Sequence, residues 1–282
     1  MKKLLLATAI SGLFAIPTLA NAQAAPAAAP TPEHTFTGNA TLISDYRFRG
    51  ISQTYKMPAV QAGFDYAHSS GFYLGTWASN VSGNQYPNGA GLEWDMYGGF
   101  KGTISGDLGF DVGLLNYWYP DARYNNAERT KFDNLEIYGA LTYKWFSAKY
   151  NYTLSDFFGV KNETYGGACQ DSRTGNGTDC FAPTPGNSKG SGYLDLSANI
   201  EVADKLTLNL HLGNQTVHNY SKLNYTDWKI GLTKDYNGWL FGIAYIGTNA
   251  EKGWYTVSEA GAPNNYKVVS KDTLLVSVGK TF

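Results

Sequence analysis

The strongest constraint on the fold is an alternation of apolar and polar residues that recurs in segments of about ten residues. The clearest segment, GLEWDMYGGFKG, alternates Leu92, Trp94 and Met96 with Glu93 and Asp95. Because successive side chains of a β-strand point to opposite faces, each such segment predicts a strand with one apolar face and one polar face.

We predict about 12 strands, an even number that suits a closed antiparallel barrel. The segment TLISDYRFRG is predicted to be a strand with Leu42, Tyr46 and Phe48 on its apolar face. The segment GFYLGTWASN is aromatic on both faces, so its orientation stays open. The predicted strands cover residues 41–50, 59–68, 71–80, 91–102, 108–119, 134–143, 146–155, 193–202, 206–215, 227–234, 239–248 and 273–282.

The connections between these segments are alternately short and long. The short ones, such as HSSG and DYNG, contain the Gly, Asp, Asn or Ser residues of tight turns. Regular alternation places every turn at one rim of a barrel and every long loop at the other, as in bacterial outer-membrane barrels with periplasmic turns. The long loops are predicted at residues 49–57, 82–90, 120–133, 156–191, 216–226 and 249–272.

Composition favours a sheet in contact with lipid. Aromatic residues make up 15% of the chain and charged residues only 16%, whereas soluble domains carry roughly 25% charged residues. After the N-terminal segment, no window reaches the roughly 18 apolar residues of a membrane-spanning helix. A soluble β-sandwich or lipocalin-like barrel is the alternative, but about 12 strands are too many for a small soluble barrel.

The N-terminus has the pattern of a secretory signal. Lys2 and Lys3 precede an apolar run, and a small-residue triplet ends at Ala22. Export together with a barrel predicts the outer membrane of a Gram-negative bacterium. We assign residues 1–22 to a signal peptide, 23–33 to an Ala/Pro-rich leader and 34–282 to a single outer-membrane β-barrel.

A resemblance to the TorF-type porins of proteobacteria lies in SDYRFRGISQT, PAVQAGFDYAHSSGFYLGTWASNVS, LEWDMYGGFKG, DVGLLNYWYP and EIYGALTY. It is strong from about residue 36 to 155 and diffuse beyond. The resemblance implies an outer-membrane barrel with channel activity, and it brings no catalytic residues. The final strand, which ends at Phe282, resembles the signal by which the barrel-assembly machinery recognises outer-membrane proteins.

If the apolar faces contact lipid, the polar faces line a lumen. Its ionisable residues are roughly nine acids to five bases, which predicts a weak preference for cations. An open lumen is favoured over one filled by charges that pair with one another. The predicted pore-lining residues are Asp45, Arg47, Arg49, Asp65, Glu93, Asp95, Lys101, Asp111, Glu136, Lys149, Asp195, Glu201, Asp227 and Lys229.

Cys169 and Cys180 lie in the longest predicted loop. An even pair of cysteines in an exported protein predicts a disulfide. The disulfide either stiffens a loop that folds over the mouth of the barrel or only resists proteolysis.

The sequence contains no evident catalytic or metal motif. The four histidines show no ligand spacing, and two cysteines without a nearby histidine make no closed metal site. We therefore expect no metal and no cofactor. His211 on a predicted lumen face could meet a serine, as an outer-membrane phospholipase would require, and this is the one enzymatic alternative.

The sequence predicts an outer-membrane channel for passive passage of small hydrophilic solutes or ions, without enzymatic activity. The alternative function is that of a closed barrel that acts as a surface receptor or adhesin through its extracellular loops. The weak net charge, from 22 basic and 23 acidic residues, argues against a nucleic-acid partner. Monomer and trimer both fit the sequence.

Overall fold

The structure, a computed structural model, describes residues 32–282. The predicted signal peptide and most of the predicted leader lie outside these residues. In the described part of the chain, no helix combines the length and the hydrophobicity needed to span a bilayer.

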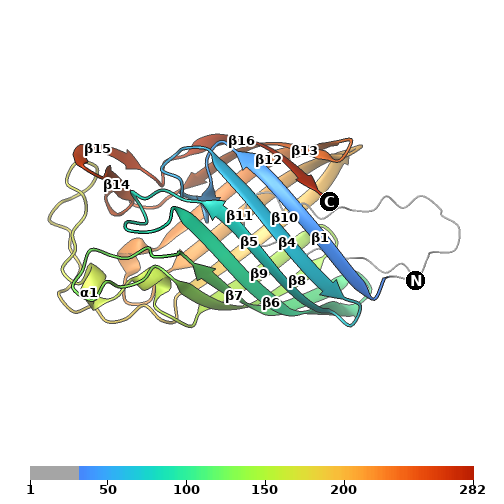
Figure 1. Ribbon diagram of the computed structural model, residues 1–282, viewed down its shortest axis with the longest axis horizontal. Coiled ribbons are helices and arrows are strands. Elements are labelled where there is room, and N and C mark those ends of the chain that lie inside the picture. The colour runs from blue at the N-terminus through green and yellow to red at the C-terminus, as the bar shows by residue number, and fades with distance from the viewer. Residues whose placement is uncertain (1–31) are drawn as a thin grey trace, which may run out of the picture.

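Twelve antiparallel strands form a closed barrel, in which β1 pairs with β4 on one side and with β16 on the other (Figure 1). The prediction of an all-β barrel of about 12 strands is confirmed. The barrel strands are β1 (His34–Ile43), β4 (Ala59–His68), β5 (Phe72–Asn80), β6 (Leu92–Ser105), β7 (Leu108–Trp118), β8 (Asn134–Tyr143), β9 (Phe146–Thr153), β10 (Gly192–Ala203), β11 (Leu206–Thr216), β12 (Tyr225–Tyr236), β13 (Trp239–Thr248) and β16 (Thr273–Thr281).

The long connections contain short elements of their own. Two small hairpins pair β2 with β3 and β14 with β15. The remaining elements are β2 (Arg47–Phe48), β3 (Ile51–Ser52), β14 (Thr256–Glu259), β15 (Ala262–Val268), the single-turn helix α1 (Asn162–Tyr165) and the 3-10 turns η1 (Phe157–Gly159), η2 (Ser221–Leu223) and η3 (Lys252–Trp254).

Short turns and long loops alternate around the barrel as predicted. The short turns lie at the end where the described chain begins and ends, and the long loops gather at the opposite end (Figure 1). We call these the turn end and the loop end. Glycine or a left-handed residue serves the turns, for example Gly238 with φ 79°.

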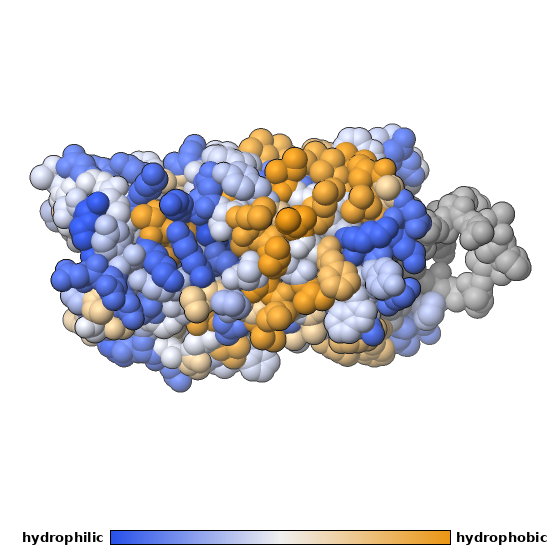
Figure 2. All heavy atoms as spheres, turned by 90° about the horizontal axis from the view of Figure 1, so that it is seen from above, coloured by the Kyte–Doolittle hydropathy of each residue, from blue (hydrophilic) through white to orange (hydrophobic). Residues whose placement is uncertain are grey.

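The outer wall of the barrel is apolar. Figure 2 shows a hydrophobic belt over the strands, next to a hydrophilic loop end. On β6, Trp94 and Met96 are exposed while Glu93 and Asp95 are buried, so the predicted alternation of this strand is confirmed. Aromatic side chains lie near both edges of the belt, including Trp94 and Trp118 toward the loops and Trp145 and Trp239 toward the turns.

The structure settles the orientation of β5, which the sequence left open. On β5, Phe72 and Leu74 are 63% and 64% exposed on the outer wall, whereas Tyr73 is 4% exposed. Tyr73 donates to Asp111 on β7 (2.6 Å), over the inner face of the intervening β6. The partner inside the barrel therefore selects the inward face of a strand that is aromatic on both.

Candidate functional site: the barrel lumen

The connection between β1 and β4 folds into the barrel, and we call residues 44–58 the inner hairpin. Strand β1 ends at Ile43, and β2 pairs with β3 inside. The prediction of one strand over residues 41–50 is therefore wrong beyond Ile43. Tyr46 and Phe48, predicted to face lipid, are 1% and 8% exposed and lie in the interior.

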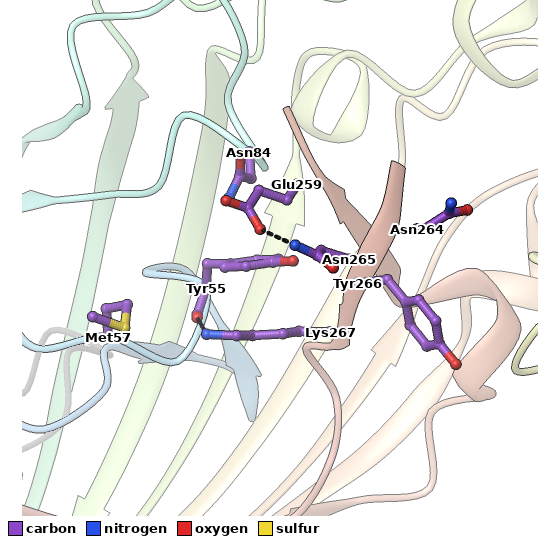
Figure 3. Close-up of a pocket in the computed structure, with 8 residues that line it drawn as sticks. All are labelled: Tyr55, Met57, Asn84, Glu259, Asn264, Asn265, Tyr266 and Lys267. Carbon is purple, nitrogen blue, oxygen red and sulfur yellow. Dashed lines mark hydrogen bonds between the residues drawn. The ribbon is translucent and has the colours of Figure 1, made fainter. Parts of the chain in front are cut away.

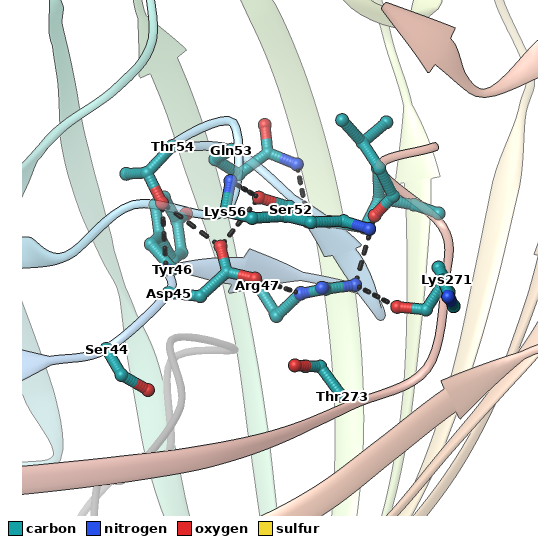
Figure 4. Close-up of polar contacts among 12 residues, drawn as sticks. Ser44, Asp45, Tyr46, Arg47, Ser52, Gln53, Thr54, Lys56, Lys271 and Thr273 are labelled. Atoms are coloured by element: carbon teal, nitrogen blue, oxygen red, sulfur yellow. Dashed lines mark hydrogen bonds and ion pairs between the residues drawn. The ribbon is translucent and has the colours of Figure 1, made fainter. Parts of the chain in front are cut away.

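The Asp45 carboxylate holds the inner hairpin together (Figure 4). It accepts hydrogen bonds from Arg47 Nε (2.7 Å), Ser52 Oγ (2.6 Å) and Thr54 Oγ1 (3.1 Å). Thr54 Oγ1 also accepts a hydrogen bond from the backbone N–H of Tyr46 (3.2 Å), and such side-chain-to-backbone bonds compete with a strand ladder. The chain therefore turns inward at the polar residues that follow β1.

The Arg47 guanidinium ties the hairpin to the loop before β16. Its Nη1 donates to the carbonyl oxygens of Gly50 (3.0 Å), Val269 (3.0 Å) and Lys271 (3.1 Å). The backbone N–H of Ser52 also donates to the Val269 carbonyl (3.0 Å). Arg47 is thus a structural residue of the hairpin, and it is only 1% exposed.

Arg49 reaches across the lumen from the tip of the hairpin. Its Nη2 donates to both carboxylate oxygens of Glu136 on β8 (2.7 and 3.0 Å), and its Nη1 donates to Gln215 Oε1 on β11 (2.8 Å). The guanidinium carbon lies 4.2 Å from the centre of the Tyr193 ring. Both side chains of the Arg49–Glu136 pair are 1% exposed, so neither charge is compensated by bulk water.

Further contacts place the hairpin against opposite walls of the barrel. Tyr46 donates to Glu93 on β6 (3.0 Å), and the Phe48 ring packs edge-on against Tyr117 on β7 (5.4 Å between centroids). On the other side, a Cβ added to Gly50 would lie 2.5 Å from Thr248 Cγ2 on β13. The inner hairpin therefore spans the lumen.

The expectation of an open lumen is wrong for this end of the barrel. We call the wall around the hairpin, which carries Glu93, Asp95 and Glu136, the loop-end lumen. These three carboxylates are 0 to 2% exposed. Glu93 Oε2 and Asp95 Oδ1 make no hydrogen bond within the described protein. An unsatisfied buried oxygen weakens a packed arrangement, so water would stabilise these carboxylates if the hairpin moved.

Toward the turn end, several charged side chains of the interior are half-buried, although Asp111, the cross-strand partner of Lys101, is 8% exposed. We call the wall that carries Asp65, Lys101 and Lys149 the turn-end lumen, and these three residues are half-buried. Tyr97 donates to Asp65 (2.6 Å), and Lys149 lies 3.9 Å from the Tyr138 ring centre. Solvent therefore reaches charged side chains on the turn side of the hairpin.

The predicted pore-lining residues fall into four groups. Thirteen lie inside the barrel, and Glu201 is exposed at the turn-end rim, where it accepts from Lys205 N–H (3.1 Å). Asp45, Arg47 and Arg49 belong to the inner hairpin. Buried on the wall are Glu93, Asp95, Asp111, Glu136 and Asp227, and half-buried are Asp65, Lys101, Lys149, Asp195 and Lys229.

His211 does meet a serine, within a network of carboxylates. Its Nδ1 lies 3.2 Å from Ser197 Oγ and 3.3 Å from Asp195, while its Nε2 lies 2.9 Å from Asp227. The Ser197 hydroxyl donates to Asp195 (2.6 Å). The geometry is that of an ion network linking three strands on the lumen side.

The predicted disulfide joins Cys169 and Cys180. The loop it closes packs on the connection between β13 and β16, where Gln170 donates to Glu251 (2.6 Å). Hydrogen bonds from Arg173 hold the pKa of the Asp171 carboxyl below its usual value. The disulfide segment and the β13–β16 connection (residues 249–272) therefore pack together at the loop end, and we call these two segments the roof.

A pocket of about 570 Å³ opens at the loop-end rim (Figure 3). Tyr55 of the inner hairpin forms one side, and residues of β14 and β15 form the other. Lys267 donates to the Tyr55 carbonyl (3.0 Å), and Asn265 donates to Glu259 (3.2 Å). The pocket thus lies where the hairpin meets the roof.

These features define the protein as a closed 12-stranded β-barrel with an apolar outer wall and a charged interior. The chain belongs to a family described as bacterial proteins of unknown function (Gcw_chp), whose sequence model matches residues 27–282. No curated protein sequence matches the chain.

Among solved structures, the chain is similar to several porins. The NanC porin matches with a TM-score of 0.49 and 9% identity, covering 88% of this chain and 99% of that one. A KdgM porin in complex with disordered oligogalacturonate matches with a TM-score of 0.47 and 7% identity, covering 88% and 98%. OprD of Pseudomonas aeruginosa matches with a TM-score of 0.37 and 11% identity, covering 90% and 67%.

Proposed function

We propose that the protein is an outer-membrane channel for small hydrophilic solutes or ions, which conducts when the inner hairpin leaves the loop-end lumen. The observation that carries the proposal is a charged inner wall behind an apolar outer wall, with solvent reaching Asp65, Lys101 and Lys149. An apolar belt suits a barrel in lipid, and a polar interior suits an aqueous path. The TorF-like segments in the N-terminal half agree with this function.

The proposal includes the route to the membrane. A signal peptide over residues 1–22 exports the chain to the periplasm of a Gram-negative cell, and the 23–33 leader precedes the barrel. The barrel-assembly machinery then recognises β16 together with Phe282, which follows it. The turn end then faces the periplasm and the loop end faces the outside.

The cation preference depends on the position of the hairpin. Asp65, Lys101 and Lys149, which solvent reaches, include both signs of charge. Withdrawal of the hairpin removes Asp45, Arg47 and Arg49 from the lumen, a net loss of one positive charge, and leaves the acids of its loop-end wall facing water. We therefore propose that the open state prefers cations.

Single-channel recording in a planar bilayer tests the channel. The double variant Arg49→Gln/Glu136→Gln removes the pair between hairpin and wall without leaving one charge buried alone. We expect longer or more frequent openings than in the wild type, with a reversal potential in a salt gradient that indicates cations. A matched control, Lys161→Gln/Glu128→Gln, removes a 2.7 Å ion pair in the loops and should leave the openings unchanged.

A second candidate is a closed barrel that acts as a receptor or adhesin. The rim pocket between Tyr55 and Lys267 favours it. If wild type and the double glutamine variant are both folded and electrically silent, the channel is excluded and this function is favoured. Excision of residues 165–185 separates the two functions further, because a roof over a pore changes conductance whereas a recognition loop changes ligand or cell binding.

We propose no enzymatic activity for the protein. The Ser197 hydroxyl is directed to Asp195 and both ring nitrogens of His211 face carboxylates, so the serine lacks a base free to take its proton. A phospholipase assay tests this point. Hydrolysis by the wild type that is lost in His211→Ala would establish the enzymatic alternative.

A further inference from the structure

A second cluster of titratable side chains lies at the turn-end rim, far along β1 and β4 from the inner hairpin. His34 and His68 are direct cross-strand partners at the ends of these strands. Glu33 precedes β1, and its carbonyl accepts from Ser69 N–H (2.9 Å). The possible ligand atoms of Glu33, His34 and His68 all lie within 4.8 Å of one another.

Both imidazoles are held by hydroxyl groups through Nδ1. His34 Nδ1 lies 3.0 Å from Tyr66 OH, and His68 Nδ1 lies 2.6 Å from Ser70 Oγ. Metal-binding histidines commonly use one ring nitrogen for such a second partner and the other for the metal. The Nε2 atom of each ring is therefore the one available to a ligand, and His68 Nε2 is 3.5 Å from Glu33 Oε1.

The tautomer required for metal binding is compatible with these contacts. A metal on His68 Nε2 requires the proton on Nδ1, which then donates to Ser70 Oγ. The longer contact from Ser70 N–H to Nδ1 (3.2 Å) is lost in that state, while the shorter contact is kept. The Tyr66 hydroxyl can accept from His34 Nδ1 in the same way.

We propose that Glu33, His34 and His68 bind a divalent transition metal of the Zn²⁺ type. Two imidazole nitrogens and one carboxylate oxygen form a ligand set that suits Zn²⁺, Cu²⁺ or Ni²⁺ better than Mg²⁺ or Ca²⁺, which prefer all-oxygen sites. Three protein ligands leave a coordination position for water. The metal joins the first barrel strand to β4 close to where the chain enters the barrel.

The site lies on the outer face at the edge of the apolar belt. The His34 ring is 6.0 Å from that of Tyr66, and Phe36, two residues further along β1, is 62% exposed. The cluster thus borders the zone where an outer-membrane barrel meets the headgroups. The carboxylate and both imidazoles remain accessible from the turn side, with Glu33 and His34 exposed.

The sequence does not reveal this cluster, for a topological reason. The two histidines are far apart in the chain, and only the register of β1 against β4 brings them together. The expectation of no metal therefore rested on local spacing alone.

Isothermal titration with ZnCl₂ tests the proposal on the tag-free protein purified from outer membranes into zwitterionic micelles, with excess Mg²⁺ present. We expect one Zn²⁺ per chain, and loss of this binding in His34→Gln/His68→Gln. The control His218→Gln changes an exposed histidine in a long loop and should bind as the wild type does. Heat-modified migration on gels verifies that each variant is folded.

The hydroxyl partners give a finer test. Tyr66→Phe and Ser70→Ala keep all three ligands and should weaken Zn²⁺ binding by about 10- to 100-fold, as is typical for outer-shell partners of metal sites. Zinc that binds equally well to the double histidine variant, or no stoichiometric binding to the wild type, overturns the proposal. The result is independent of whether the barrel conducts.

Discussion

The two ends of the lumen are lined by the same alternating strands but differ in how far solvent reaches their charged side chains. At the loop end, Glu93 and Glu136 are 0% and 1% exposed because the inner hairpin packs on them. At the turn end, Asp65 and Lys101 are half-buried. The strands supply a charged inner wall along the whole barrel, and a single connecting segment determines how much of it water can reach.

The largest effect is expected from Arg49→Ala. This change leaves Glu136 buried without its cation and should lower the free energy of unfolding by about 3–5 kcal/mol. Lys101→Ala at the turn end should lower it much less, because solvent reaches that region. Denaturant unfolding in micelles measures both variants. Equal losses at the two ends would contradict the contrast between them.

Gly50→Ala should destabilise the hairpin by about 2–4 kcal/mol. The residue has φ 80° and packs against Thr248 and Asp227, so a methyl group adds both backbone strain and overlap. Gly238 is the matched control, since its φ is 79° but nothing lies within 4 Å of an added Cβ. Gly238→Ala should therefore lower the free energy of unfolding only through backbone strain, by about 1–2 kcal/mol. Similar midpoints for both variants would show that the tip of the hairpin is not tightly packed.

Tyr46→Phe sharpens the comparison by removing one hydroxyl. The hydrogen bond from this hydroxyl to the buried Glu93 should contribute about 1.5–3 kcal/mol to the free energy of unfolding. Tyr97→Phe removes a comparable bond to the half-buried Asp65. It should lower the free energy of unfolding less than Tyr46→Phe does, since water can replace the lost donor. We expect more frequent channel openings only in Tyr46→Phe, and bilayer recordings of the two variants check this.

The smallest effect is expected from lowering the pH, which protonates Asp171 in the disulfide segment and weakens the packing of that segment. The pKa of Asp171 is lowered in the folded protein by Arg173, so its contribution to stability is present above the unfolded pKa of about 3.9 and is lost as pH falls through the folded value. The Arg173–Asp171 pair lies in a surface loop, where solvent screens the interaction and keeps the effect small. Protease protection of the 165–185 segment should weaken below about pH 4 in the wild type, and Asp171→Asn should remove that dependence.

Features with a local period were predictable from the sequence. The alternation of apolar and polar residues with a period of two identified the strands, and Gly, Asp and Asn identified the turns. Both signals depend on backbone geometry within a few residues. The outward face of β6, with Trp94 and Met96, followed from the same pattern. The disulfide between Cys169 and Cys180 was predictable because these are the two cysteines of a chain predicted to be exported, and both lie in one loop.

Features that depend on partners from distant strands required the tertiary structure. TLISDYRFRG alternates like a strand, yet Asp45 gains hydrogen bonds from Ser52 and Thr54 only when the chain turns inward. Arg49 finds Glu136, and His34 finds His68, through barrel closure and strand register. The sequence by itself determined a barrel with a polar interior, whereas only long-range pairing decided that its loop end is filled and that two distant histidines meet at its rim.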